Sequence, residues 1–314
     1  MLTIAVLSGG TSGEREISLQ SGAEVLAALD PRRYKVIALD PRVDLARLVE
    51  LAPSLDMALV IMHGRGGEDG CLQGLLDLLG VPYQCSGVLG CALAMNKVLS
   101  KVIYRTKELP VAADIVLHRG QVAQAEHLIS THLGWPAVVK PANEGSSLGV
   151  SIVHNEQELT AALELAFTLD ELILVEEFLN GLEVTAAVLG NRDLWALPLV
   201  EIVPPPRSFF DFTAKYSGLS QEICPARISG RTGELIQDMA IRAHQALQLK
   251  GYSRSDFILH ADKGPILLET NPIPGMTAGS LLPLAARSAG LSFSQLLDKL
   301  IELALESETG AKRG

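Results

Sequence analysis

The chain has 314 residues, which is long enough for two or three domains around a sizeable core. Its net charge of −10 argues against nucleic acid or an anionic membrane as the main partner. Aromatic residues make up only 4% of the chain, so we expect an α/β core packed from Leu, Val and Ala side chains.

Three further features predict a soluble protein of a reducing compartment. The four cysteines show no paired spacing, so neither a zinc site nor a disulfide framework is predicted. The apolar run at the N-terminus is short and has no basic residues before it, unlike a secretory signal. No segment approaches the roughly 20 apolar residues of a membrane span. We therefore expect a cytoplasmic protein with no membrane partner.

The N-terminal region predicts a doubly wound α/β domain. Residues 2–7 form a continuous apolar run, as in a buried parallel strand, and a glycine turn follows at 9–13. Residues 14–29 have helical periodicity, and further strands are expected at 34–40 and 57–62. A strand, a glycine turn, a helix and a strand in this order begin a Rossmann-like sheet.

The same pattern also suits a dinucleotide-binding domain, with Asp40 on the ribose. The objection is Glu14, with Glu16 beside it, in the first turn of the predicted helix. A pyrophosphate at that place would need free backbone amides and positive potential. A carboxylate repels phosphate but would hold an ammonium group, so these glutamates argue against NAD.

A glycine loop, His63–Gly70, follows the third strand at the edge where open α/β sheets bind ligands. Four glycines in eight residues indicate a backbone that bends sharply or comes close to a ligand. For His63 alone, a structural role and a binding role are about equally supported. Helices are expected next, at 71–79 and at 92–106, and the second one carries Lys97 and Lys101.

A second unit contains a candidate phosphate loop. A strand at 135–140 ends in Lys140, and a loop of small residues at 141–149 leads to another strand. The backbone amides of this loop and the hydroxyls of Ser146 and Ser147 suit a polyphosphate. This is not the Walker motif, because the lysine precedes the loop on a strand. An ordinary hairpin turn is the alternative, and Lys140 favours phosphate.

The next elements are a helix at 156–169 and strands at 172–179 and 181–190. An irregular segment of about 20 residues follows, at 204–225, and such a segment inside a compact domain is usually functional, often a lid. The remaining expected elements are helices at 232–249, 281–289 and 292–305, and a polar, frayed tail at 306–314.

A hairpin near the C-terminus brings polar groups together. Strands are predicted at 255–260 and 265–271, joined by a turn at Asp262–Lys263. With that turn, Asp256 lies opposite Glu269, and Arg254 lies opposite Asn271. A turn at Lys263–Gly264 instead would keep the same faces matched and would shift only the partners. Two carboxylates ~4 Å apart repel by roughly 4 kcal/mol at an effective dielectric of 20, so a cation should lie between them. Oxygen ligands on neighbouring strands suit Mg²⁺, although a solvated hairpin with surface acids is the alternative.

Six motifs in this order resemble the D-alanine–D-alanine ligases of the ATP-grasp superfamily. They are residues 9–18, 63–70, 140–149, 209–216, 254–256 and 269–277, with Ser280–Leu281 just beyond. The resemblance runs from Ile4 to about Ile301. It implies a Rossmann-like N-terminal domain at 1–92, followed by an ATP-grasp module with a central α+β domain at 93–180 and a C-terminal α+β domain at 181–314.

The activity implied by the resemblance is the ATP-dependent joining of two D-alanines through an acylphosphate, for peptidoglycan precursor synthesis. ATP would be bound by residues of the central and C-terminal domains: Lys97, Lys140, Ser146, Ser147, Glu176, Glu177, Leu179 and Glu183. Asp256, Glu269 and Asn271 would hold two Mg²⁺ ions, with Mn²⁺ able to substitute.

The two amino acids would also have their own residues by resemblance. Glu14 would hold the ammonium of the first D-alanine, with His63 nearby. The carboxylate of the second would lie at Ser280 and Leu281, aided by Lys215. The remaining catalytic residues implied are Arg254 and the Gly275 N–H, which would stabilise the tetrahedral oxyanion, and Tyr216, which would pair with Ser146 over the site.

Several positions depart from the family pattern: Cys85, Asn96, Phe210, Pro272–Ile273 and Gly279. They leave open a ligase that joins D-alanine to D-lactate, D-serine or another amino acid. The Lys215–Tyr216 pair marks the dipeptide makers of the family, so D-lactate is expected to be a poor second substrate. A non-catalytic nucleotide-binding regulator would be expected to lose the metal ligands, which are intact. A homodimer is expected because dimers are common in the family.

Overall fold

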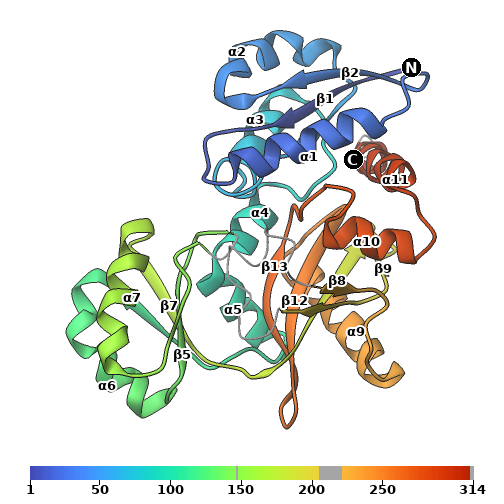
Figure 1. Cartoon of the computed structure of the whole chain (residues 1–314). Coiled ribbons are helices and arrows are strands. Elements are labelled where there is room, and N and C mark those ends of the chain that lie inside the picture. Colours follow the sequence, from blue (N-terminus) through green and yellow to red (C-terminus); the bar gives the residue numbers. More distant parts are fainter. Residues whose placement is uncertain (146–147, 205–220, 312–314) are drawn as a thin grey trace.

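The computed structural model describes residues 1–145, 148–204 and 221–311 (Figure 1). Within these residues the strands form three separate sheets. The N-terminal sheet has the order β2-β1-β3 and is entirely parallel, with strands β1 (Leu2–Ser8), β2 (Tyr34–Leu39) and β3 (Met57–Ile61). β3 is buried along its whole length, as expected for a parallel strand covered on both faces.

Three helices belong to this part of the chain: α1 (Arg15–Ala28), α2 (Pro41–Leu51) and α3 (Cys71–Leu79). A 3₁₀ turn at Ala52–Ser54 follows α2. α1 and α3 are confirmed. α2 was not predicted from the sequence, because charged residues interrupt its apolar positions.

Asp40 is engaged in the structure of this domain. Its side chain caps α2 by accepting a hydrogen bond from the Arg42 N–H at 3.0 Å. It also accepts from the Gly10 N–H at 2.9 Å and pairs with Arg15, whose hydrogen bond lowers the pKa of Asp40 to about 2. These contacts argue against a ribose-binding role for Asp40.

The helix expected at 92–106 is two helices, α4 (Val88–Met95) and α5 (Lys97–Thr106), so that expectation was wrong. The break is at Asn96, which has an extended backbone and whose side chain accepts from the Leu99 N–H at 2.9 Å. Asn96 is therefore the N-cap of a new helix. In Figure 1 the two helices run down the middle of the molecule, where both contact β13 (Gly264–Asn271).

The second sheet is antiparallel and has the order β4-β7-β5-β6. Its strands are β4 (Asp114–His118), β5 (Ala137–Pro141), β6 (Ser151–Val153) and β7 (Leu172–Glu177). A 3₁₀ turn at Arg119–Gln121 leads into α6 (Val122–His132), which packs with α7 (Glu156–Leu169) against this sheet. α7, β5, β6 and β7 were predicted from the sequence, whereas β4 and α6 were not.

The third sheet has the order β11-β10-β8-β12-β13, with β9 (Trp195–Ala196) beside β8. Its remaining strands are β8 (Gly181–Leu189), β10 (Val200–Val203), β11 (Gln221–Ile223) and β12 (Tyr252–His260). α9 (Gly230–Ala246) packs against this sheet. Its buried residues Ile236, Met239 and Ala240 share a core with Val184 and Phe257.

The described chain ends with α10 (Leu281–Ser288) and α11 (Phe293–Ala311). α11 returns to the N-terminal sheet and lies beside α1 (Figure 1). Its buried Leu297 and Leu300 join the core that contains Ile4 and Val6. The helix continues to Ala311, so it is longer than the helix expected at 292–305.

The three sheets follow the order of the three expected domains, whose boundaries at 92/93 and 180/181 stay predictions. Packing crosses both boundaries, because α5 contacts β13 and α11 contacts β3. Among the described residues, no helix is both long and apolar enough to cross a membrane.

Candidate active site

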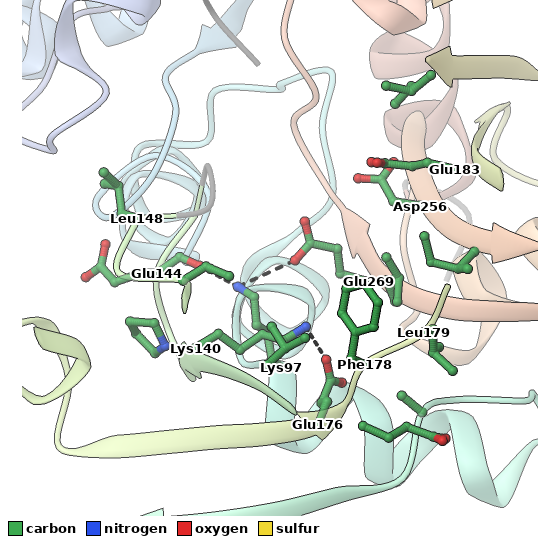
Figure 2. Close-up of a pocket in the computed structure, with 18 of the residues that line it drawn as sticks. Lys97, Lys140, Glu144, Leu148, Glu176, Phe178, Leu179, Glu183, Asp256 and Glu269 are labelled. Atoms are coloured by element: carbon green, nitrogen blue, oxygen red, sulfur yellow. Dashed lines mark hydrogen bonds and ion pairs between the residues drawn. The ribbon is translucent and has the colours of Figure 1, made fainter. Parts of the chain in front are cut away.

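A cleft opens between the second and third sheets (Figure 2). One wall is formed by β5, β7 and the start of α5, and the other by β12 and β13. The lining combines apolar side chains with charged ones. The charged residues are Lys97, Lys140, Glu144, Glu176, Glu177, Glu183, Arg254, Asp256 and Glu269.

Two lysines hold a buried glutamate at the edge of the cleft. The Glu176 carboxylate pairs with Lys140, from the neighbouring strand, and with Lys101, from α5. Lys101 is almost fully buried and also contacts Asp114 at 3.0 Å and the Ala112 carbonyl at 2.9 Å. Burial acts to raise the pKa of Glu176, but the two ammonium groups outweigh it and hold the pKa below its ordinary value.

Lys97 connects the two walls of the cleft. Its ammonium donates to the Glu144 carbonyl on one side and lies 3.5 Å from Glu269 Oε2 on the other (Figure 2). Lys97 is also the first residue of α5. Its charge adds to the positive end of the helix dipole, an arrangement that suits an anionic ligand.

The opposite wall carries the predicted hairpin residues. Asp256 lies opposite Glu269, and Arg254 lies opposite Asn271, so both predicted pairings are confirmed. The Arg254 guanidinium forms two hydrogen bonds to Asp256, at 2.8 and 2.7 Å. Asp256 also accepts from the Thr185 hydroxyl at 2.7 Å and from Asn271 Nδ2 at 3.3 Å.

The donor chemistry of this wall fits a magnesium ion. In the described residues, no group of three or more His, Cys, Asp or Glu side chains is placed to hold a metal. Asp256, Glu269 and Asn271 instead offer two carboxylates and one amide from adjacent strands. Mg²⁺ takes few protein oxygens when phosphates complete its shell, so such a set suits a metal that arrives with a nucleotide.

The predicted first-substrate residues lie on the N-terminal loops. Glu14 is buried at the start of α1. His63 is also buried, with Nδ1 3.8 Å from Glu68 Oε1 and Nε2 3.5 Å from Ser21 Oγ. Burial acts to lower the pKa of His63, but Glu68, and after it Glu14, raise it overall. The His63 ring therefore lies beside the Glu68 carboxylate, and the Glu14 carboxylate is close enough to act on its pKa.

The residues predicted for the second amino acid lie where α10 begins. Ser280 precedes the helix, but its hydroxyl does not cap it and instead contacts Thr277 Oγ1 at 2.7 Å. A methyl group added to Gly275 would lie 3.0 Å from Ser280 Oγ, so these two residues are close neighbours. Leu281 lines the main cleft together with Arg254. The predicted oxyanion and carboxylate residues therefore lie near one another.

A family model described as D-ala D-ala ligase C-terminus matches residues 103–302, which is more than half of the chain. The chain belongs to the D-alanine–D-alanine ligase family. The family predicted from the sequence is thereby confirmed, and the solved structures described below confirm the fold class.

Relatives in this ligase family cover almost the whole chain. A D-alanine–D-alanine ligase of Syntrophobacter fumaroxidans is 54% identical over 97% of this chain and 98% of its own length. Another, of Desulfotalea psychrophila, is 53% identical over 99% of this chain and 97% of its own.

Solved structures of such ligases have the same fold. The Bacillus anthracis D-alanine–D-alanine ligase complexed with ATP superposes with a TM-score of 0.86, at 32% identity, over 99% of this chain and 100% of its own. The VanG D-Ala:D-Ser ligase of Enterococcus faecalis superposes with a TM-score of 0.83, at 32% identity, over 96% of this chain and 99% of its own.

Most of the ligase residues predicted from the sequence lie along the cleft or beside it. Glu177 receives a hydrogen bond from the Ala113 N–H at 3.0 Å and pairs with Lys263 from the hairpin turn. Leu179 and Glu183 line the cleft. The predicted residues that lie outside the described part of the chain are Ser146, Ser147, Lys215 and Tyr216.

Four residues that matter to the geometry of this ligase were given no role from the sequence. Lys101 was placed on a helix, but its burial depends on Glu176, which is 75 residues away along the chain. Glu68, Arg65 and Glu144 lie within the motifs of the family, and their charges were the available signal. What the motifs could not show is that Arg65 and Glu144 meet, at 2.9 Å.

Asn96, a departure from the ligase pattern, has a structural role. Its side chain caps α5 and also donates to Asn143 Oδ1 at 2.7 Å. Asn143 belongs to the predicted phosphate loop, so Asn96 ties the start of the helix to that loop.

The other departures from the ligase pattern have separate positions. Cys85, Pro272 and Ile273 are buried. A methyl group added to Gly279 would meet no described atom within 4 Å. Phe210 lies outside the described residues.

Proposed function

We propose that this protein joins two D-alanines into D-alanyl-D-alanine at the expense of ATP, in the synthesis of peptidoglycan precursors. The observation that carries the proposal is the cleft itself. Lys97 and Lys140 line one wall, and Asp256 and Glu269 face each other on the other wall. Cations for phosphates and oxygen ligands for a metal thus lie in one cavity, within a chain of this ligase family.

ATP would occupy the cleft, with its phosphates at Lys97 and Lys140 and its adenosine toward Glu177, Leu179 and Glu183. The carboxylate of Glu176 is held by two lysines, so its role would be to fix Lys140 for the phosphates. We also propose that the hydroxyls of Ser146 and Ser147 reach the phosphates.

Asp256, Glu269 and Asn271 would hold two Mg²⁺ ions, with Mn²⁺ as a substitute. Bound there, the metal would neutralise phosphate charge. Asp256 has a second duty, because its two hydrogen bonds fix the plane of the Arg254 guanidinium. An oriented donor of this kind can stabilise an oxyanion without reorganising during the reaction.

The first D-alanine would bind between the N-terminal loops and the cleft. Glu14 would hold its ammonium group, with His63 close by. The carboxylate would attack the γ-phosphorus of ATP, so that ADP leaves and an acylphosphate forms. The amine of the second D-alanine would then attack the acyl carbon. A carbon–nitrogen bond forms, the carbon–oxygen bond to phosphate breaks, and the amine loses a proton.

The second D-alanine would present its carboxylate to Ser280 and the Leu281 N–H, with Lys215 nearby. Arg254 and the Gly275 N–H would stabilise the tetrahedral oxyanion. Tyr216, paired with Ser146, would help keep water from the acylphosphate.

A ligase that uses D-serine as second substrate is a second candidate, because the VanG D-Ala:D-Ser ligase superposes on this chain about as well as the D-alanine ligase does. The test is phosphate release from ATP with D-alanine alone and with D-alanine plus D-serine or D-lactate, followed by mass analysis of the product. We expect D-alanyl-D-alanine to dominate at neutral pH. A mixed product dominating in the competition would replace the proposal.

Three further expectations belong to the same proposal. We propose that residues 1–92, 93–180 and 181–314 act as the three domains of the enzyme. We propose a homodimer in the cytoplasm, where the nucleotide is available. The net charge of −10 supports a protein without a nucleic-acid or membrane partner.

A further inference from the structure

Arg65 extends from the N-terminal glycine loop to residues of the second sheet and its helices. It lies between Gly64 and Gly66, which both have left-handed backbones, with φ of +73° and +83°. Its Nε lies 2.9 Å from Glu144 Oε1, and its Nη2 donates to the Leu169 carbonyl at 3.3 Å. Leu169 is the last residue of α7, where the helix dipole favours a cation.

Glu144 lines two neighbouring cavities. It lines the main cleft, and it also lines a second, smaller cavity that reaches Glu68. Both cavities are also lined by Lys97 and Glu269. Lys97 donates to the Glu144 carbonyl and approaches Glu269, as Figure 2 shows. The Glu144 backbone therefore helps to fix the ammonium beside the proposed metal ligand.

The residue after Glu144 lies against the proposed first-substrate residue. A methyl group added to Gly145 would lie 2.7 Å from Glu14 Oε1, and one added to Gly64 would lie 3.2 Å from the same atom. The Glu14 carboxylate is thus close to both Gly64 and Gly145. Arg65 follows the first of these glycines and Glu144 precedes the second, so the Arg65–Glu144 pair joins the same two segments.

We infer that Arg65 is a positioning residue, which through Glu144 aligns the site of the first D-alanine with Lys97 and the phosphates. This inference rests on the proposed function. Phosphoryl transfer needs the attacking carboxylate and the phosphorus close and in line, and a misplacement of about 1 Å can be costly. The first D-alanine would bind at the N-terminal loops, and the phosphates would bind at Lys97 and Lys140. The Arg65–Glu144 pair connects these two regions.

Loss of this pair would have two effects on the reaction. Glu144 and the ammonium of Lys97 would be less well fixed, so phosphoryl transfer would slow. Water would also reach the acylphosphate more often. Its attack on the acyl carbon breaks the bond to phosphate and returns free D-alanine, so phosphate is released without a dipeptide.

The chain offers a matched control for this pair. Arg119 is 55% exposed in its side chain, against 53% for Arg65, and it also pairs with one carboxylate, Glu171, and one carbonyl, of Phe167. It lies on the 3₁₀ turn after β4 and is not one of the described residues that line the cleft. Exposed ion pairs contribute little to folding, so both arginines can be replaced without unfolding the protein.

The experiment compares the wild type with Arg65→Gln, Glu144→Gln, the double variant Arg65→Gln/Glu144→Gln, and Arg119→Gln. Phosphate release and dipeptide formation are measured together at saturating ATP and D-alanine. We expect Arg65→Gln to lower kcat for the dipeptide about fivefold, the rate equivalent of an exposed ion pair. The ratio of phosphate to dipeptide should rise above one, and the double variant should be no worse than the more impaired single variant.

Arg119→Gln should match the wild type in both measurements. If Arg65→Gln behaves like Arg119→Gln, or if the effects of the two single variants multiply in the double variant, the positioning role is wrong while the proposed function stands. A slower dipeptide rate with the phosphate ratio kept at one would also contradict the role, because a site that loses this connection must admit water. If the wild type itself releases no phosphate with D-alanine, the proposed function fails.

Discussion

Asp256 faces Glu269 across β12 and β13, one position away from a β-bulge. On the turn side of the bulge, Phe257 pairs with Leu267, so Leu268 has no pairing partner on β12. The bulge offsets the register by one residue, and Asp256 and Glu269, paired across the two strands, both line the cleft. Bulges are common next to active sites, where they aim a side chain.

The carboxylates of Asp256 and Glu269 differ in their burial and in the residues that they contact. Asp256 is buried and is bonded to Arg254 and Thr185. Glu269 is 30% exposed in its side chain and lies 3.5 Å from Lys97. Glu269→Gln is therefore the cleaner variant, because it removes a charge from the proposed metal site and leaves the Arg254–Asp256 ion pair in place.

We predict that Glu269→Gln keeps its thermal stability close to that of the wild type but loses D-alanine-dependent ATP turnover by at least about 100-fold, on the scale of lost electrostatic stabilisation in catalysis. Asp256→Asn should lose turnover and also unfold at a lower temperature. Turnover and thermal unfolding are measured over a range of Mg²⁺ concentrations. Near-normal turnover by either variant at ordinary Mg²⁺ would show that these residues do not hold the metal.

The hairpin shows how far the sequence could predict this site. Alternation of side chains along two strands was enough to predict that Asp256 and Glu269 face each other. The predicted two-residue turn was nevertheless wrong, because the loop contains the three residues 261–263 and Gly264 follows with a left-handed φ of +72°. The pairing at the site was right because the bulge compensates for the longer loop, and no local pattern predicts that compensation.

Contacts between residues far apart in the chain could not be predicted from the sequence. The pairing of Lys101 with Glu176 joins a helix to a strand of the second sheet, and a lysine on a predicted helix is usually exposed. The break at Asn96 was in principle predictable, since Asn is a strong N-cap, but the apolar periodicity on both sides hid it. β4 and α6 were missed because neither shows a clear period in the sequence.

A second prediction concerns the buried ion pairs of Glu176. Glu176→Gln leaves Lys101 buried with less compensation, so we expect it to destabilise the fold by about 3–5 kcal/mol at neutral pH. The free energy of unfolding is measured by urea denaturation. The double variant Lys101→Met/Glu176→Gln serves as control and should recover part of the loss, because it removes the buried charge as well as its partner.

The same pair sets a pH dependence with a definite sign. The pKa of Glu176 is lower in the folded protein than its ordinary value of 4.5. Its contribution to stability is therefore complete above the unfolded pKa and is lost as the pH falls toward the folded pKa. The difference in stability between the wild type and Glu176→Gln should be constant between about pH 6 and 8 and should shrink below about pH 4.5. A difference that grows in acid would contradict the assignment.

A third prediction tests the role of Glu14. Glu14→Gln should raise the KM for the first D-alanine far more than the KM for ATP, because of the two substrates only D-alanine, through its ammonium group, would contact this carboxylate. Initial rates are measured over D-alanine and ATP concentrations varied independently.

In a companion measurement, ATP with Mg²⁺ should protect the wild type against thermal unfolding, since a ligand that binds only the folded state stabilises it. Protection by NAD alone would instead support a dinucleotide-binding protein.

The last prediction concerns the place proposed for the second D-alanine. Gly275 and Gly279 lie on the same segment between β13 and α10, and neither has a positive φ. A methyl group on Gly275 would lie 3.0 Å from Ser280 Oγ, which is tighter than ordinary contact, whereas one on Gly279 would meet no described atom within 4 Å. Gly275→Ala should therefore displace the Ser280 hydroxyl, and Gly279→Ala should not.

We expect Gly275→Ala to raise the KM for the second D-alanine several-fold and to lower kcat, since the Gly275 N–H is a proposed oxyanion donor whose loss of position weakens transition-state stabilisation. The KM values for ATP and for the first D-alanine should change much less, because Gly275 is not one of the described residues that line the nucleotide cleft. Gly279→Ala is the control and should match the wild type in all of these values. If the two variants have equal effects, displacement of the Ser280 hydroxyl does not affect the binding of the second D-alanine. The carboxylate of that D-alanine would then have to bind away from Ser280.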